Sequence, residues 1–316
     1  MNLRIGSRGS QLALWQANHI AALLRAQGHA VEIRILKTTG DRLQEISFAQ
    51  VGSKGMFTKE IEEALAAGEV DLAVHSLKDL PTELPAPFTL AATPVRVDPR
   101  DVFVSVQHPS LAALPAAARI GTSSQRRRAQ LKALRPDLEA VEFRGNVDTR
   151  LRKLAEGQVD AILLAAAGLD RLERAESVRE RLEPSQFCPA AGQGALGIEA
   201  RLGDESVLSA LAFLNDPATR YAVTAERAAL AALGGGCQVP IGVHVRPLAD
   251  TPQQVELFAV VAAPETGVAV RIHHVADPAA TQPEALGQLA AQMLLDAGAG
   301  PLLAAPVLSD PGEALR

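Results

Sequence analysis

The sequence is poor in cysteine and aromatic residues, and it contains no long apolar run. Two cysteines among 316 residues are too few for a disulfide framework, which favours a reducing, cytoplasmic location. Aromatic residues make up 3% of the chain, so few side chains could stack on the bases of single-stranded nucleic acid. The longest apolar runs, such as residues 161–169, fall far short of the ~20 residues of a membrane span, and we expect no signal peptide.

The net charge of −5 is small, but it is unevenly distributed along the chain. Between Arg119 and Lys153, ten basic and four acidic residues give a charge of +6, which leaves −11 for the rest of the sequence. A local basic cluster in an acidic chain favours one anionic ligand over a long polyanion such as nucleic acid. Arginines on a solvated helix face remain the alternative explanation.

The first two thirds of the sequence alternate between short apolar strands and amphipathic helices, and the length predicts two or three domains. This alternation predicts α/β domains with largely parallel sheets, and the proline-rich residues 81–99 are a candidate boundary. We expect strands at residues 3–6, 31–36, 70–75, 102–106, 119–121, 141–144 and 159–165, and helices at 11–27, 58–67, 124–134 and 147–156.

The pattern changes after residue 217. A helix at 218–233, three alternating strands near 243–246, 255–261 and 268–274, and a last helix at 285–297 predict a small α+β domain. Just before this change, Gly192–Gly197 spells G-x-G-x-x-G. A dinucleotide site needs a helix after the glycines, but residues 196–200 look like a strand. We therefore expect a turn where the chain crosses between domains.

Two motifs at the predicted ends of strands could bind or transform a ligand. Gly121–Ser124 precedes a helix that carries Arg126 and Arg127 in its first turn, which is typical of an anion site, although a plain serine N-cap is the alternative. Because arginines oppose the dipole there, we expect them to face an anion. His75–Asp79 follows a buried strand, where Lys78 and Asp79 could serve acid–base chemistry or simply cap and solvate the strand end.

Three glycines precede Cys237, at Gly234, Gly235 and Gly236. A run of glycines next to one thiol suggests an exposed, closely approached cysteine that could act as a nucleophile or a carrier, whereas a buried cysteine is the usual alternative. No spacing typical of a metal site is present, so we expect none.

Seven motifs in order make the chain similar to the porphobilinogen deaminase (hydroxymethylbilane synthase) family. The matching stretches are Arg4–Ala13, Val51–Gly55, His75–Pro81, Gly121–Ser124, Arg144–Val147, Gly192–Ala195 and Gly236–Gly242. Gln125 and Cys188 depart from the residues expected at their positions, and Cys188 raises the question of a second reactive thiol.

The resemblance implies an α/β fold in which two domains similar to periplasmic binding proteins flank a cleft, followed by a small C-terminal α+β domain. The implied domains are residues 1–97 plus 194–215, residues 98–193, and residues 216–316. They would carry the catalytic aspartate, the basic segment and the cofactor-bearing cysteine, respectively.

The resemblance also implies an activity. Such a transferase deaminates porphobilinogen and joins four units head to tail on a covalent dipyrromethane cofactor, releasing hydroxymethylbilane for tetrapyrrole biosynthesis. Asp79 matches the catalytic position and Cys237 the thioether attachment point, while Lys54 and Lys59 fall in the active-site loop. Positions that match cofactor or substrate contacts are Arg8, Ser10, Lys78, Thr122, Ser123, Ser124, Arg126, Arg127, Arg144, Asn146, Arg150 and Gln193.

We expect a cytoplasmic monomer whose partner is the small molecule porphobilinogen, without metal, nucleic acid or membrane. Two alternatives stay open at this point. A non-catalytic anion-binding module would share the first two domains, but it would need neither Asp79 nor the thiol. A nucleic-acid-binding protein that uses Arg126–Arg128 is disfavoured by the pI of 5.8 and by the scarcity of aromatic residues.

Overall fold

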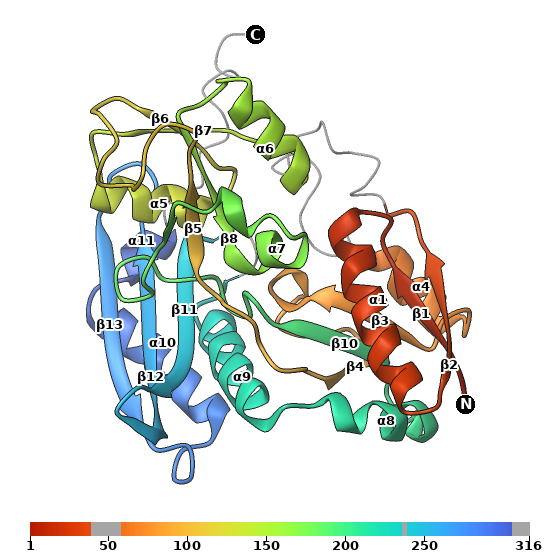
Figure 1. Ribbon diagram of the computed structural model, residues 1–316. Coiled ribbons are helices and arrows are strands. Elements are labelled where there is room, and N and C mark those ends of the chain that lie inside the picture. Colours follow the sequence, from red (N-terminus) through yellow and green to blue (C-terminus); the bar gives the residue numbers. More distant parts are fainter. Residues whose placement is uncertain (39–57, 236–238, 305–316) are drawn as a thin grey trace, which may run out of the picture.

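A computed structural model describes residues 1–38, 58–235 and 239–304 of the chain (Figure 1). The described residues form two five-stranded sheets with helices and one three-stranded sheet near the C-terminus. The α/β class with a small C-terminal α+β unit, as predicted, is confirmed. Within these ranges no helix combines the length and apolarity needed to cross a membrane.

The first sheet contains the N-terminal strands and a strand that returns from later in the chain. Its order is β2 (Ala30–Ile35), β1 (Asn2–Ser7), β3 (Leu72–Ser76), β10 (Leu196–Arg201) and β4 (Phe88–Ala92). The sheet packs against α1 (Gln11–Ala26), α4 (Lys59–Ala66) and α8 (Glu205–Leu211). Ile20 and Leu24 of α1 share one apolar core with Leu3 and Leu72, while Ile61 of α4 belongs to a second. Burial of these side chains supports the helix–sheet packing.

The second sheet repeats the strand order of the first. Its order is β7 (Glu139–Val141), β6 (Arg119–Gly121), β8 (Ala161–Ala165), β5 (Asp101–Val104) and β9 (Glu180–Arg181). Its helices are α5 (Gln125–Leu134), α6 (Val147–Ala155) and α7 (Ala166–Arg171). β1 in the first sheet and β6 in the second pair in parallel with both of their neighbours. The fourth strand in each order, β10 or β5, runs antiparallel.

The prediction of largely parallel sheets therefore needs a correction. β10 is antiparallel to β3 and β4, and β5 is antiparallel to β8 and β9. Each antiparallel strand directly adjoins a segment that crosses between the two sheets, so its direction follows from the crossing rather than from a strand–helix–strand unit. The proline-rich residues 81–99 are not wholly a boundary either, because β4 lies among them as an edge strand.

The third sheet is an antiparallel meander backed by helices. It consists of β11 (Ile241–Leu248), β12 (Thr251–Ala262) and β13 (Ala269–Ala276), and its helices are α9 (Pro217–Ala232), α10 (Pro283–Asp296) and the short α11 (Gly300–Ala304). α9 and α10 approach so closely that a Cβ at Gly287 would lie 2.3 Å from the carbonyl oxygen of Ala225. Val260 and Ala262 pack with Ala129 of α5, which joins this unit to the second sheet.

Two crossing segments connect the first two sheets and run side by side between them (Figure 1). Residues 93–100 lead from β4 to β5, and residues 182–195 lead from β9 to β10. The amide of Val97 donates to the carbonyl oxygen of Gly194 at 3.4 Å. Gly194 has a φ of +88°, and a Cβ there would lie 2.6 Å from the carbonyl oxygen of Val97, so this close approach requires glycine.

Candidate active site

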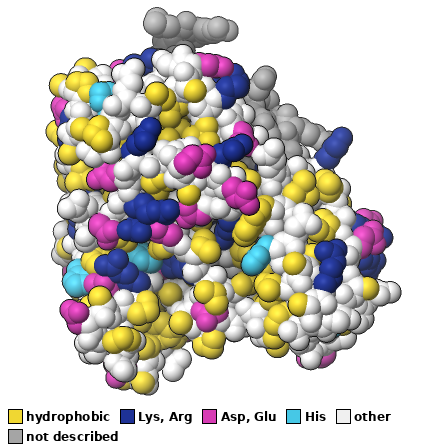
Figure 2. Space-filling view, viewed as in Figure 1, with side chains coloured by type: hydrophobic (Ala, Val, Ile, Leu, Met, Phe, Trp, Pro, Cys, Tyr) yellow, Lys and Arg dark blue, Asp and Glu magenta, His cyan; other side chains and the backbone are white. Residues whose placement is uncertain are grey.

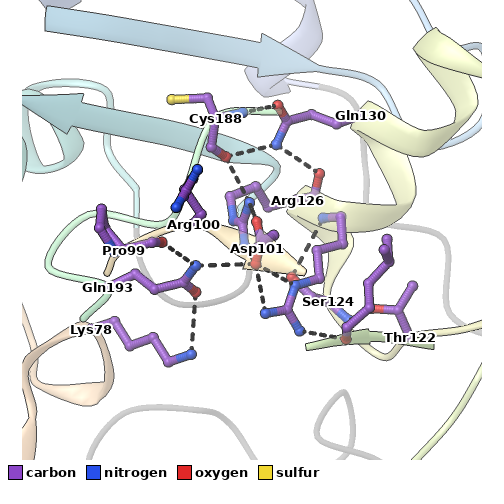
Figure 3. A network of polar contacts seen from close by, with 12 residues as sticks. Lys78, Pro99, Arg100, Asp101, Thr122, Ser124, Arg126, Gln130, Cys188 and Gln193 are labelled. Atoms are coloured by element: carbon purple, nitrogen blue, oxygen red, sulfur yellow. Dashed lines mark hydrogen bonds and ion pairs between the residues drawn. The ribbon is translucent and has the colours of Figure 1, made fainter. Parts of the chain in front are cut away.

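A buried carboxylate, Asp101, lies at the start of β5 and binds two arginines from α5 (Figure 3). Arg126 reaches it with Nη1 at 2.6 Å and Nη2 at 3.2 Å, and Arg127 with Nη2 at 2.7 Å and Nε at 2.9 Å. Asp101 is 0% exposed. Burial alone would raise its pKa, but the two guanidinium charges outweigh burial and hold the pKa well below its usual range.

The start of α5 is formed by the loop Gly121–Ser124. The Ser124 hydroxyl accepts from the amide of Arg127 at 3.5 Å, and Thr122 accepts from the amide of Ser124 at 3.2 Å. The serine N-cap is therefore present. The anion that the two arginines contact is Asp101, a carboxylate of the protein itself, and their binding of a ligand carboxylate stays a prediction. One carboxylate faces two guanidiniums, which leaves the group with a net positive charge.

Lys78 and Gln193 connect this group to the first sheet. Lys78 belongs to the short 3₁₀ helix Leu77–Asp79 after β3, and its Nζ donates to Gln193 Oε1 at 3.3 Å. Gln193 Nε2 in turn donates to Asp101 at 3.0 Å and to the Pro99 carbonyl at 2.7 Å. Burial lowers the pKa of Lys78 to about 8, and the two α5 arginines act in the same direction, against Asp79 and Asp101. Asp79 itself is exposed at the same end of β3.

A second group of cations consists of Arg150 in α6 and Arg144 just before that helix. Arg150 has a buried Nε without a hydrogen-bond partner among the described residues. Burial lowers the pKa of Arg150 to about 10, and the charges of Arg127 and Arg144 act in the same direction. Arg144 pairs with Glu142 at 2.7 Å. An arginine among like charges with an unused donor is suited to a carboxylate ligand.

The first turns of α1 and α6 line one cavity of about 680 Å³. Ser10 caps α1 by accepting from the amide of Ala13, and Asn146 caps α6 by accepting from the amide of Thr149 at 2.8 Å. Arg8 is partly buried and directly precedes Gly9, the first residue that lines this cavity. Two of the predicted site residues, Ser10 of the first unit and Asn146 of the second, thus line one space.

Charged side chains on the molecular surface are mixed in sign. On the face shown in Figure 2, basic and acidic side chains lie next to one another. Arg128, for example, pairs with Glu142, and Arg135 pairs with Asp137. Part of the excess of positive charge in residues 119–153 is therefore directed inward, to the buried Arg126 and Arg127.

Sequence reasoning missed three residues of this region: Asp101, Gln130 and Arg171. Gln130 is fully buried and pairs with the backbone of Cys188, accepting from its amide at 2.7 Å and donating to its carbonyl at 2.9 Å. Arg171 donates to the carbonyl of Gly194 at 2.8 Å, while its Nε has no partner among the described residues. Only Asp101, an acid at the start of a predicted strand, had a sequence signal that could have been noticed.

Three lysine and cysteine predictions have different outcomes. Cys237 and Lys54 lie outside the described residues. Lys59 begins helix α4, within the predicted helix 58–67, and its Nζ lies 3.9 Å from Glu63 Oε1; its place in an active-site loop stays a prediction. Glu60 and Glu62 in the first turn favour a helix start at this point.

Cys188, the second cysteine, is buried. It is 1% exposed, and its Sγ lies 3.4 Å from the Phe258 carbonyl. Burial raises the pKa of this thiol far above its usual range. A thiol that stays protonated and enclosed is a poor nucleophile.

Comparisons with known proteins cover nearly the whole chain. The family model described as porphobilinogen deaminase, dipyromethane cofactor binding domain, matches residues 3–209, and that of the porphobilinogen deaminase C-terminal domain matches residues 220–296. The porphobilinogen deaminase of Roseiflexus castenholzii is 51% identical over 96% of this chain and 99% of its own length. That of Nitratidesulfovibrio vulgaris is 50% identical over 96% of both chains.

Among solved structures, the methionine-binding protein MetQ is similar at a TM-score of 0.45 and 11% identity, over 67% of this chain and 89% of its own. The two family models and the full-length relatives decide the identity. The chain belongs to the porphobilinogen deaminase family, transferases that use a dipyrromethane cofactor to join four porphobilinogen units into hydroxymethylbilane for tetrapyrrole biosynthesis.

Proposed function

We propose that the reaction takes place between the first two sheets, with Asp79 as the catalytic carboxylate and Cys237 as the attachment point of the cofactor. The observation that carries this proposal is the position of Asp79. It is an exposed carboxylate next to the partly buried Lys78, and Lys78 is joined through Gln193 to the Asp101–Arg126–Arg127 group. One exposed acid beside several buried cations suits a substrate that carries carboxylates and develops a positive charge.

The residues of this region fit a dipyrromethane, whose rings carry carboxylate side chains. Buried Nε atoms of Arg150 and Arg171 have no hydrogen-bond partner within the described ranges, which supports an anionic occupant. When bound, the cofactor supplies the pyrrole to which substrate units are joined. The residues proposed to hold it or the substrate are Arg8, Ser10, Lys78, Thr122, Ser123, Ser124, Arg126, Arg127, Arg144, Asn146, Arg150 and Gln193.

Asp79 would act on the substrate in two ways. Loss of ammonia from porphobilinogen leaves a cation delocalised over the pyrrole, and a carboxylate beside the ring N–H stabilises that charge. The same oxygen atoms can transfer a proton to the departing amine and later accept one from the newly joined ring. Lys78 and the arginines would bind the substrate carboxylates and so orient the ring toward Asp79.

Burial of the other cysteine supports Cys237 as the point of attachment. Cys188 is enclosed between α5 and β12, and its thiol remains protonated. Helix α9 ends at Ala232, five positions before Cys237, in the unit that packs against both crossing segments. A thioether needs an accessible sulfur, which Cys188 does not offer.

Intact-mass spectrometry tests this assignment. Purified wild-type protein should be heavier than its polypeptide by one dipyrromethane. Cys237→Ala should have the bare polypeptide mass and no activity, whereas Cys188→Ala should keep the cofactor and most activity. An adduct retained in Cys237→Ala, or found on a Cys188 peptide, would exclude the assignment.

We also propose the domain division 1–97 plus 194–215, 98–193 and 216–316. It is supported by the three sheets, because β5 begins at Asp101 and β10 begins at Leu196. We further propose a cytoplasmic monomer that binds no nucleic acid, supported by the pI of 5.8 and the 3% aromatic content. Light scattering on the purified protein, and its mobility with and without RNA, test these two statements.

A further inference from the structure

Glu226, in the middle of α9, is a fully buried carboxylate that the proposed reaction does not use. Its Oε1 accepts from Arg96 at 2.6 Å, from the amide of Val245 at 2.8 Å and from His244 at 3.3 Å. Its Oε2 accepts from the amide of Gly192 at 2.7 Å and from Arg96 at 3.1 Å. Burial alone would raise the pKa of Glu226, but Arg96 and His244 lower it to about 2, so the group is a carboxylate at neutral pH.

These contacts hold the backbone in position on both sides of the Gln193 side chain. Gly192, the preceding residue, donates its amide directly to Glu226. Arg96, held by both oxygens of Glu226, uses Nε to donate to the carbonyl oxygen of Gln193 at 2.8 Å. The carboxylate of α9 therefore joins both crossing segments at one point.

The side chain of Gln193 continues from this point into the candidate active site (Figure 3). Its amide accepts from Lys78 and donates to Asp101 and to the Pro99 carbonyl. The fit is tight, because a Cβ at Gly192 would lie 3.3 Å from the amide nitrogen of Lys78. A shift of the backbone at 192–193 would thus move both the Lys78 contact and the Asp101 contact.

We propose that Glu226 is a positioning residue for the reaction, which from the C-terminal unit fixes the Gln193 backbone and thereby sets the Gln193 side chain between Lys78 and Asp101. This inference rests on the proposed function. It adds that one carboxylate, on the helix that precedes the cofactor-bearing cysteine, controls the contact between Gln193 and Lys78 next to Asp79. Glu226 touches no reacting atom in this scheme and acts only through Gln193.

The negative charge and both oxygen atoms are needed for this role. Glutamine at 226 would keep the volume, but its NH₂ group would face the donors now bound by one carboxylate oxygen. Arg96 would also lose its counter-ion in a buried place, which is strongly unfavourable. Aspartate keeps the charge and both acceptors at a shorter reach, so it should retain part of the function.

The chain offers a matched control in the same unit. Glu256 on β12 also pairs with one arginine and one histidine, Arg246 at 2.7 Å and His273 at 3.1 Å. None of its hydrogen bonds or ion pairs in the described residues reaches a crossing segment. Its partner Arg246 lies 3.8 Å from Glu183 of the second crossing segment, ten residues before Gln193, so Glu256→Gln removes a charge from the same unit without removing a contact of Gly192 or Gln193.

The experiment compares Glu226→Gln, Glu226→Asp and Glu256→Gln, with kcat expressed per cofactor-bearing molecule as counted by intact mass. We expect kcat to fall at least about tenfold in Glu226→Gln, with a smaller change in KM, and to recover partly in Glu226→Asp. Glu256→Gln should stay within about twofold of wild type. Equal kcat values in all four proteins would overturn the proposal.

A merely structural role of Glu226 is separated from positioning by a double-mutant cycle of Glu226→Asp with Gln193→Met. If Glu226 acts through Gln193, then Glu226→Asp should change kcat by less than twofold in the Gln193→Met background. Full additivity of the two effects would show that Glu226 is merely structural and would overturn the proposal.

Amide exchange of the peptide 189–195 in purified protein supplies a readout that does not depend on turnover. We expect faster exchange in Glu226→Asp and wild-type exchange in Glu256→Gln. Unchanged exchange in Glu226→Asp would contradict the proposal. Loss of Cys237 as the attachment point would overturn the proposed function while leaving this exchange result unaffected, so the two failures are distinguishable.

Discussion

Asp101 binds both Arg126 and Arg127, although it precedes them by 25 and 26 residues, and all three side chains are buried. Arg126 also donates to the Cys188 carbonyl at 2.6 Å, which ties the group to the second crossing segment. The arginines at the start of α5 are thus held in place by the protein before any ligand arrives. Pre-positioned cations lower the entropy lost when carboxylates bind.

Asp101→Asn should destabilise the protein strongly. The amide keeps the shape but leaves two buried guanidiniums without a counter-charge, and breaking such a group costs about 3–5 kcal/mol of unfolding free energy. Urea denaturation measures this loss. Asp137→Asn, which removes a solvent-screened partner of Arg135, should change stability far less. Equal stability of the two variants would contradict the role of Asp101.

Stability should fall at acid pH for a specific reason. The pKa of Glu226 is lowered from 4.5 to about 2 in the folded protein, so its contribution is complete above pH 4.5 and is lost as the pH falls toward 2. The pKa of Asp101 is also lowered in the folded protein, so its contribution to stability is likewise lost as the pH falls. Melting temperatures between pH 7 and pH 2.5 should therefore decline below about pH 4.5. Glu226→Gln should show a shallower decline, and an identical slope in the variant would refute this assignment.

Much of the fold could be predicted from the sequence because hydrophobic periodicity is local. Except for β4 and β9, the strands of the two α/β units lie within a few residues of their predicted positions, and so do the helices α1, α5, α6 and α9. The prediction failed where partners distant in sequence decide the outcome. The sequence pattern does not predict β4 and β9, which are short edge strands. β7 begins two residues before its predicted position because its pairing with β6 sets its limits.

The candidate site was predictable only in part, for a related reason. Motifs identified Lys78, Asp79, Arg126 and Arg127, but no local pattern indicated that the α5 arginines share Asp101. Glu226 is likewise an unremarkable residue within an amphipathic helix, and its partners in the crossing segments, Gly192 and Arg96, are 34 and 130 residues away. Such buried charge pairs arise from the tertiary fold and carry no spacing rule.

Asp79→Asn should cripple turnover and leave the fold unchanged. The side chain is exposed, so its replacement removes no packing, whereas loss of a charge opposite a developing cation commonly costs ~10²–10³ in rate. Single-turnover kinetics and a melting curve check both statements. Glu83→Gln, at another exposed acid four positions later, is the control and should turn over normally. Turnover of Asp79→Asn within threefold of wild type would remove Asp79 from the mechanism.

Removal of individual arginines should stop the enzyme at different stages. Arg126 binds Asp101 and the Cys188 carbonyl, so Arg126→Leu should both lower the melting temperature and impair assembly of the cofactor. If Arg126 only opposed the helix dipole, Arg126→Leu would be as stable as the wild type or more stable. Because Arg126 pairs with Asp101, we expect Arg126→Leu to be less stable instead. Arg150 has an Nε without a partner in the described part of the chain, so Arg150→Leu should keep its melting temperature.

The two variants should also differ in mass. Arg126→Leu should accumulate largely at the bare polypeptide mass, whereas Arg150→Leu should carry the dipyrromethane and stall during elongation, because its unused donor is suited to carboxylates that arrive later. Intact-mass spectrometry after addition of limited porphobilinogen counts the pyrrole units on each protein. Arg119→Leu, at an exposed arginine of the same basic segment, is the control and should elongate as the wild type does. Full cofactor loading and normal elongation in Arg126→Leu would show that the charge of the Asp101 group does not serve the bound carboxylates.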